Sequence, residues 1–408
     1  MPLCHLANVE LHLVCQFLSV KDHLRLQATC QRLYRLGQDP AAWQVVHTNG
    51  RPLPPALLSR CTLARTVRGH IQSDADLTAL ASCTRLTRLH IPHSDIKDAN
   101  PLHSLCNVTS LHLAHTSIPD VKFLARWTRL KWLRLYGCRK LKTVETLQRL
   151  RTLTVLNISN TQVATLQPVA GLRGLRVLRC HRCREIRDVK PLKHLRHLRA
   201  LTLADTAVHC LRPLARLKSL LRLDIAGTQV ADVTPLQDLH CLTYLDISST
   251  PVTDLQPLAD LHRLHDLMAQ HTHVTSIPIP SLTTLNLFGT RLRSLAMVTS
   301  LPNLTHAMLG PAPTVDTLEP LTRLTKLVDL SIHRFEAVTD LSPLVDLPNL
   351  KALCVANTPV TDVACLTTLP KLSTFSTRGT EVCSFAALNS TMKQVRHDTW
   401  VRKRLPPV

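Results

Sequence analysis

Aromatic residues are scarce in this sequence and make up 3% of its 408 residues. A hydrophobic core must therefore be built from leucine and other aliphatic side chains. The sequence also contains no nucleophile–base pair, no phosphate-binding loop and no carboxylate dyad in a recognisable arrangement. We therefore predict no catalytic site, no enzyme activity and no cofactor.

Long apolar runs are also missing, and no stretch of about 18 uninterrupted apolar residues is available for a membrane-spanning helix. The N-terminal residues MPLCHLANVEL lack the basic and then apolar segments of a secretory signal. The 14 cysteines are scattered, which favours free thiols in a reducing compartment. These features predict a cytoplasmic or nuclear protein without a membrane partner.

One pattern recurs through most of the chain and is clearest in residues 242–261, LTYLDISSTPVTDLQPLADL. Its template is L-x-x-L-x-L-x-x-T-x-V-x-D-L-x-P-L-x-x-L, with a period of 22 or 23 residues and one shortened unit that contains SIPIPSLTTL. Fourteen units follow one another, which predicts a solenoid. They start at Leu86, Val108, Leu130, Leu153, Leu175, Leu198, Leu220, Leu242, Leu264, Leu282, Leu304, Leu327, Leu350 and Leu372.

The template explains how such a chain would fold. Each L-x-x-L-x-L run predicts a short strand whose apolar side chains are buried only when neighbouring units stack. The proline of the D-L-x-P-L segment is tolerated early in a helical turn, because its missing N–H has no partner there. The threonine is expected to point inward and hydrogen-bond the turn backbone, and it is replaced by cysteine at Cys138 and Cys183.

This is the pattern of a leucine-rich repeat. The units with Cys138 and Cys183 resemble the cysteine-containing repeats of the F-box class, and the others resemble the internalin type. The resemblance implies an α/β solenoid, a leucine-rich-repeat horseshoe with parallel concave strands and short convex helical or 3-10 turns.

Residues 6–43 do not fit the repeat and show helical spacing, with a break and an N-cap at Ser19. They resemble an F-box, although the usual Leu-Pro opening is Leu6-Ala7 here. The resemblance implies docking on the linker subunit of a cullin-based ubiquitin ligase. The docking residues would be Leu6, Leu11, Val14, Leu18 and Leu24. A helical cap that merely shields the first repeat is the alternative.

Four segments are expected along the chain. These are a small helical F-box-like domain at 1–46, a linker and degenerate capping repeat at 47–85, the repeat solenoid at 86–388, and a basic tail or cap at 389–408.

Function in such a solenoid is expected on the concave strands, at the positions between the leucines. Aromatic and arginine side chains anchor interfaces more often than other types, so the concave strands of repeats two to five are expected to hold a protein partner. We predict that the partner contacts Trp132, Arg134, Tyr136, Arg179, His181, Arg182, Asp224, Tyr244 and Asp246.

Two other interpretations concern the same region. His90 and His112 share one template column and His93 and His115 share another, but a flat sheet rarely provides a tetrahedral zinc site. We therefore predict no metal. Cys180 and Cys183 resemble half a zinc motif, but both occupy inward positions, so core packing is expected.

The net charge of +21 leaves nucleic acid open as a secondary partner. Many cations lie in repeats three to six, mostly at loop and convex positions, and no repeated aromatic platform accompanies them. The sequence therefore favours an adaptor that brings a protein partner to a ubiquitin ligase. A non-enzymatic scaffold that binds RNA or an acidic partner in a ribonucleoprotein or cytoskeletal assembly is the alternative.

Overall fold

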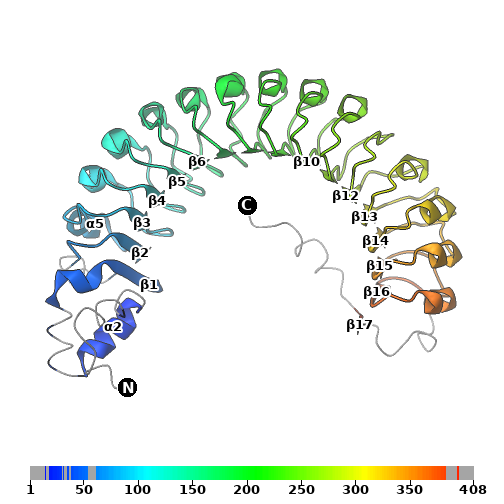
Figure 1. Cartoon of the computed structure of the whole chain (residues 1–408), viewed down its shortest axis with the longest axis horizontal. Coiled ribbons are helices and arrows are strands. Elements are labelled where there is room, and N and C mark those ends of the chain that lie inside the picture. Colours follow the sequence, from blue (N-terminus) through cyan, green and yellow to red (C-terminus); the bar gives the residue numbers. More distant parts are fainter. Residues whose placement is uncertain are drawn as a thin grey trace. The chain divides into compact units, whose positions relative to one another are not determined.

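The computed structural model describes residues 14, 18–29, 31, 35, 38–53, 61–382 and 393–394. The chain divides into two compact units, Met1–Ala207 (unit 1) and Val208–Val408 (unit 2), which are treated separately below. In each unit, parallel strands line the inner side of the bend and short 3-10 helices line the outer side (Figure 1).

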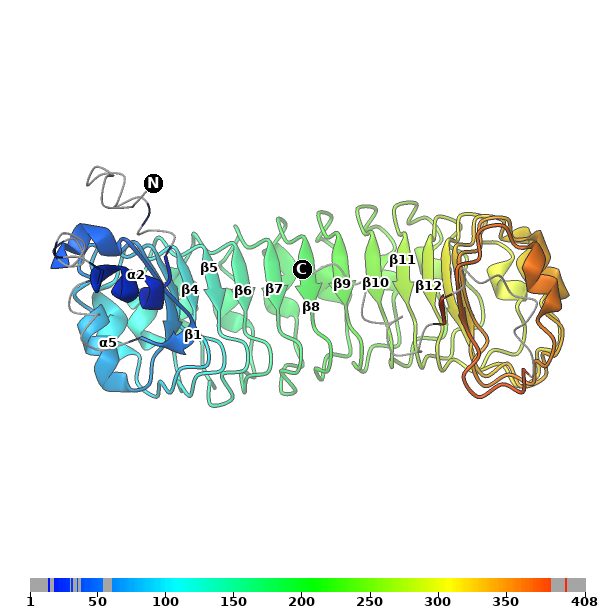
Figure 2. The same ribbon diagram turned by 90° about the horizontal axis from the view of Figure 1, so that it is seen from below.

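Unit 1 contains α2 (Val20–Gln27), α5 (Asp74–Leu80) and the parallel strands β1 (Val45–Pro52), β2 (Thr66–His70), β3 (Arg88–His90), β4 (Ser110–His112), β5 (Trp132–Arg134), β6 (Val155–Asn157), β7 (Val177–Arg179) and β8 (Ala200–Thr202). Its 3-10 helices are η2 (Pro40–Trp43), η3 (Asn100–Ser104), η4 (Lys122–Arg126), η5 (Glu145–Arg149), η6 (Gln167–Val169) and η7 (Lys190–His194). Figure 2 shows β4 to β8 side by side.

Unit 2 repeats this arrangement with the parallel strands β9 (Arg222–Asp224), β10 (Tyr244–Asp246), β11 (Asp266–Met268), β12 (Thr284–Asn286), β13 (His306–Leu309), β14 (Asp329–Ile332), β15 (Ala352–Cys354), β16 (Thr374–Ser376) and β17 (Lys393–Gln394). Its 3-10 helices are η8 (Arg212–Leu214), η9 (Thr234–Leu236), η10 (Gln256–Leu258), η11 (Ala296–Val298), η12 (Glu319–Arg323), η13 (Ser342–Asp346) and η14 (Ala364–Thr368).

The predicted repeat is confirmed. Each of the fourteen starts, from Leu86 to Leu372, lies two residues before one of the strands β3 to β16. The shortened unit is the one in which β11 and β12 are joined without a described helix or 3-10 turn. The strand leucines are fully buried, as Leu133 and Leu156 illustrate. The fold is therefore a leucine-rich-repeat solenoid with an aliphatic core.

The polar positions of the template hold the turns together. The seven predicted repeat prolines lie at the start of convex 3-10 helices, and Pro101 lies at the start of an eighth. The aspartate before such a helix accepts the N–H two residues ahead, as Asp232 does from Thr234. The threonine after each strand donates to the carbonyl three residues back, so Thr206 Oγ1 donates to Leu203 O at 2.6 Å. Cys138 instead donates to Leu113 of the preceding repeat.

Two further results concern the redox state of the cysteines and the length of the helices within the residues that the structure describes. All ten cysteines in these ranges are free thiols, and Cys180 and Cys183 are buried in the core, as predicted. No helix in the same ranges has the length and apolar character needed to cross a bilayer.

The N-terminal segment contains one predicted feature and one unpredicted strand. Ser19 caps α2 by accepting from the Asp22 N–H, as predicted, and the ring of Trp43 stacks on His23 with centroids 4.0 Å apart. Residues 47–52, expected to begin a linker, instead belong to β1, which pairs with β2. The β-branched pair Val45 and Val46 favours a strand here, although no leucine template marks it.

Replacing Thr206 by valine tests the threonine hydrogen bond. The variant keeps the shape of the side chain but removes the donor from the buried Leu203 carbonyl. We expect the free energy of unfolding to fall by about 1–2 kcal/mol, measured by chemical denaturation. The exposed Thr128→Val is the matched control. Equal losses in both variants would contradict a role for this hydrogen bond.

Candidate functional site

The inner face of unit 1 is made of side chains on either side of the buried strand leucine. The register aligns Arg88, Ser110, Trp132, Val155, Val177 and Ala200 in a first column, and His90, His112, Arg134, Asn157, Arg179 and Thr202 in a second. Neighbouring residues of one column lie about 4.8 Å apart. The predicted contact residues Trp132, Arg134 and Arg179 are therefore brought onto one surface.

This surface has a single sign of charge. No residue of β2 to β7 is acidic, nor is any of the three residues that follow each of β3 to β7. The cations on these strands are Arg68, Arg88, Arg134 and Arg179. The positive charge of the inner face is therefore not balanced by carboxylates on the same strands.

Trp132 is the exposed apolar group of the surface. Its side chain is 44% exposed, although it lies on a regular central strand. Its register neighbours Ser110 and Val155 are smaller, so they do not cover the indole ring. Tyr136 follows on the same repeat, half-buried, with its ring 5.1 Å from that of His115 and 5.6 Å from that of His112.

Four histidines extend this surface towards the N-terminus. The rings of His93 and His115 are stacked with centroids 4.4 Å apart, and those of His90 and His112 meet edge-on at 5.9 Å. His90 Nε2 lies 2.9 Å from Ser110 Oγ. In the described ranges no group of three or more histidine, cysteine, aspartate or glutamate side chains is arranged to hold a metal ion.

Two of these histidines, His90 and His112, border a hollow of about 400 Å³. It opens on the inner face of β1 to β4. Its lining is formed by Val45, His47, Arg68, Gly69, His90, Pro92 and His112.

Burial and neighbouring arginines keep two of these histidines neutral. The pKa of His90 is lowered to about 4 by burial and then by Arg68, Arg134 and Arg88. The pKa of His112 is lowered to about 4 by burial and then by Arg134, with smaller effects from His90, His93 and His115. Burial and Arg134 also lower the pKa of Arg179. The positive potential of the arginines therefore disfavours protonation of His90, His112 and Arg179.

A column of left-handed residues follows the strands. His93, His115, Asn160, Arg182 and Asp205 have φ between 55° and 60°. The matching position after β5 is Gly137, with φ of 76°, and a Cβ there would lie 2.5 Å from His115 Nδ1. Glycine is therefore required where the His115 ring lies over the next repeat. This column has no simple residue signature, so the template did not reveal it.

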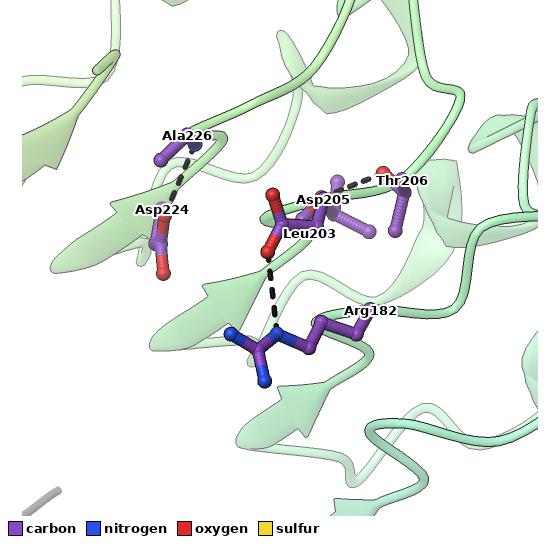
Figure 3. Close-up of polar contacts among 6 residues, drawn as sticks. All are labelled: Arg182, Leu203, Asp205, Thr206, Asp224 and Ala226. Atoms are coloured by element: carbon purple, nitrogen blue, oxygen red, sulfur yellow. Dashed lines mark hydrogen bonds and ion pairs between the residues drawn. The ribbon is translucent and has the colours of Figure 1, made fainter. Parts of the chain in front are cut away.

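The predicted contacts His181 and Arg182 follow β7 and are exposed. Arg182 Nε lies 3.5 Å from Oδ2 of Asp205, the first acidic residue at the end of this surface, and Figure 3 shows the pair. Both side chains are more than half exposed, so the pair stabilises the fold little. Although His181 is exposed, partial desolvation of its ring lowers its pKa, and Arg182 and Arg179 lower it further.

The predicted contacts in unit 2 have structural partners. Asp224 accepts the Ala226 N–H at 3.1 Å (Figure 3), and Asp246 accepts the Ser248 N–H at 2.9 Å. Tyr244 is only 7% exposed, lies under the Arg222 guanidinium at 4.1 Å, and donates to Asp246 Oδ2 at 3.3 Å. Burial and Asp246 raise the pKa of Tyr244, and burial raises that of Asp246.

The predicted docking residues are only partly described. Leu6 and Leu11 lie outside the described residues. Val14 and Leu18 are half-buried, and Leu24 on α2 is 42% exposed. Among the three described residues of this set, Leu24 is therefore the most accessible apolar side chain for a partner.

Comparison with solved structures shows the fold. A leucine-rich-repeat protein of Leptospira interrogans has a TM-score of 0.77 at 18% identity, over 86% of this chain and 93% of that one. An internalin, InlF, of Listeria monocytogenes has a TM-score of 0.59 at 22% identity, over 79% and 88%. TLR13, in a complex with ssRNA13, has a TM-score of 0.63 at 18% identity, over 84% of this chain and 59% of that one. No family model and no curated protein matches the sequence.

The lowered histidine pKa values predict acid sensitivity. Between pH 6.5 and about 4, His90 and His112 are protonated in the unfolded chain but stay neutral in the folded one. The free energy of unfolding therefore falls as the pH is lowered through this window. Replacing both residues by glutamine should reduce this fall, measured by denaturation at a series of pH values. His103→Gln with His194→Gln, on the outer 3-10 helices, is the control pair. If the His90 and His112 double variant lost stability with falling pH as steeply as the wild type, these two histidines would not be the cause of the acid sensitivity.

Proposed function

We propose that the chain is a binding protein whose inner face on β4 to β7 holds a protein partner. The observation that carries this proposal is the 44% exposed Trp132 on a regular strand. An exposed tryptophan beside arginines is typical of interface hot spots, because it buries a large area with little loss of side-chain freedom. Arg134 is its neighbour two residues along the strand, and Arg179 lies two strands away in the same column as Arg134.

The unit 2 residues have a smaller part in this proposal. Tyr244 is nearly buried, and the Asp224 and Asp246 carboxylates already accept turn N–H groups. A partner that reached them would compete with bonds that hold the turns. We therefore assign the main contacts to Trp132, Arg134, Tyr136, Arg179, His181 and Arg182.

The proposed biological role is an adaptor that brings this partner to a cullin-based ubiquitin ligase. The support is the F-box-like pattern of residues 6–43, together with the exposed Leu24 on the capped helix α2. The free thiols of the described cysteines agree with a cytoplasmic or nuclear location. The proposed organisation keeps a helical docking module at 1–46, a capping segment at 47–85, the solenoid at 86–388 and a basic end at 389–408.

An RNA-binding scaffold is the second candidate function. The net charge of +21 and the arginines of the inner face favour it. Against it, the rings of His93, His115 and Tyr136 contact one another rather than form an open series for base stacking.

Truncating Trp132 and Arg134 to alanine tests the site. The double variant removes an exposed ring and an exposed charge from one strand, so we expect the proteins recovered in a pull-down with the full chain to fall by at least about tenfold. Recovery is measured by quantitative mass spectrometry.

Arg126→Ala with Arg149→Ala is the control, since both arginines are exposed at the outer ends of η4 and η5. This pair should recover the same partners as the wild type. Unchanged recovery in the Trp132 and Arg134 variant would place the contact elsewhere.

Replacing Leu24 by aspartate tests the adaptor role. A charge at this exposed apolar position should abolish recovery of cullin and its linker subunit, while leaving inner-face partners bound. The control is Arg25→Ala, which lowers the net charge by the same amount on the same helix. Absence of cullin from the wild-type pull-down would refute the adaptor role. It would not contradict the proposed partner-binding face.

A further inference from the structure

We propose that the inner face of β2 to β7 recognises an acidic, extended segment of a partner protein, with Arg68, Arg134 and Arg179 pairing with its carboxylates beside Trp132. This inference rests on the binding function proposed above. It adds the chemical class of the partner, which is anionic, and enlarges the site to include the hollow in front of β1 to β4.

The first argument is the unbalanced charge. The second column of the inner face runs from Arg68 through His90, His112 and Arg134 to Arg179. No carboxylate lies on these strands, and the first one beyond them, Asp205, is already paired with Arg182. Arginines that have no local counter-ion on a concave surface attract an anionic partner and repel a cationic one.

The second argument is the response of the titratable groups. Burial is the largest cause of the lowered pKa of His90, His112 and Arg179, and nearby arginines add to it: Arg68, Arg134 and Arg88 at His90, and Arg134 at His112 and Arg179. Arg134 therefore opposes positive charge on both sides of its strand, at the two histidines and at Arg179. A row of carboxylates from a partner would relieve this repulsion at every position.

The third argument is spacing. Arg134 and Arg179 are two strands apart, which places their backbones about 9.6 Å apart, and Arg68 is three strands, or about 14 Å, from Arg134. A peptide in the polyproline II conformation that crosses the strands advances about 3.1 Å per residue and returns its side chains to the same face every three residues. Carboxylates three residues apart, about 9.3 Å, would therefore meet Arg134 and Arg179, and the hollow near Arg68 would accept one end of the segment.

A protein segment suits this surface better than a nucleic acid does. Single-stranded nucleic acids use a series of accessible rings for stacking. Here Trp132 is exposed on its strand, whereas the exposed rings of His93 and His115 stack on each other and Tyr136 packs edge-on against His115. Carboxylates need only the guanidinium groups, which form two parallel hydrogen bonds with them.

The test measures fluorescence anisotropy of a labelled peptide of about ten residues with glutamate at every third position, the period at which a polyproline II segment places side chains on one face. The full chain is titrated at neutral pH and physiological salt. We expect the wild type to bind this peptide and to ignore the same peptide with lysine in place of glutamate. Arg134→Glu with Arg179→Glu should weaken binding by at least about tenfold. Arg134→Gln with Arg179→Gln, which removes the charge without reversing it, should give an intermediate loss.

The control pair is Arg173→Glu with Arg196→Glu, which changes the net charge equally at exposed positions outside the strands. It should bind within about twofold of the wild type. An equal loss in the control pair, absence of peptide binding, or tighter binding of a single-stranded RNA of similar length would each overturn the proposal. The chain could still capture a partner through Trp132 without binding the acidic peptide. That result would refute the acidic character of the partner but not the proposed binding face.

Discussion

The structure of each unit depends on leucine side chains that no single repeat can bury. The central residue of nearly every strand is an inward leucine, and its burial is completed by stacking of the repeats before and after it. Burying one such side chain contributes about 1.5–3 kcal/mol, so a stack of repeats accumulates a large stabilisation without aromatic residues. The same stacking sets the strand register, and the register decides which polar side chains become neighbours on the inner face.

This dependence explains why the solenoid could be predicted from the sequence. The leucine period locates fourteen strands, and the proline and threonine positions predict the convex turns and their hydrogen bonds. The strand β1 could not be predicted in the same way. It has no leucine template, and its pairing with β2 includes an irregular register between His47 and Pro52. When a strand is stabilised by pairing with a neighbour and lacks the leucine repeat, a single sequence gives little basis for predicting it.

The candidate site was predictable in position but not in detail. The template placed Trp132, Arg134 and Arg179 on one face, because register follows the repeat. It could not show that Asp224 and Asp246 accept turn N–H groups or that Tyr244 is nearly buried beneath Arg222. These facts depend on side-chain conformations and on packing against neighbouring repeats. A template identifies which side chains share a face, whereas three-dimensional packing decides which of them remain available.

The inner face of unit 1 combines a stable backbone with an unfavourable charge distribution. The turns after its strands are held by left-handed residues, and His115 lies so close to Gly137 that a Cβ there would clash. The arginines above them repel one another, and burial with the same arginines lowers the pKa of His90 and His112 to about 4. Since the leucine stack fixes the strand positions, the charged columns cannot separate to reduce this repulsion. Binding an anion is the means by which such a rigid surface can lower its electrostatic energy, and rigidity also reduces the entropy lost when the partner is ordered on it.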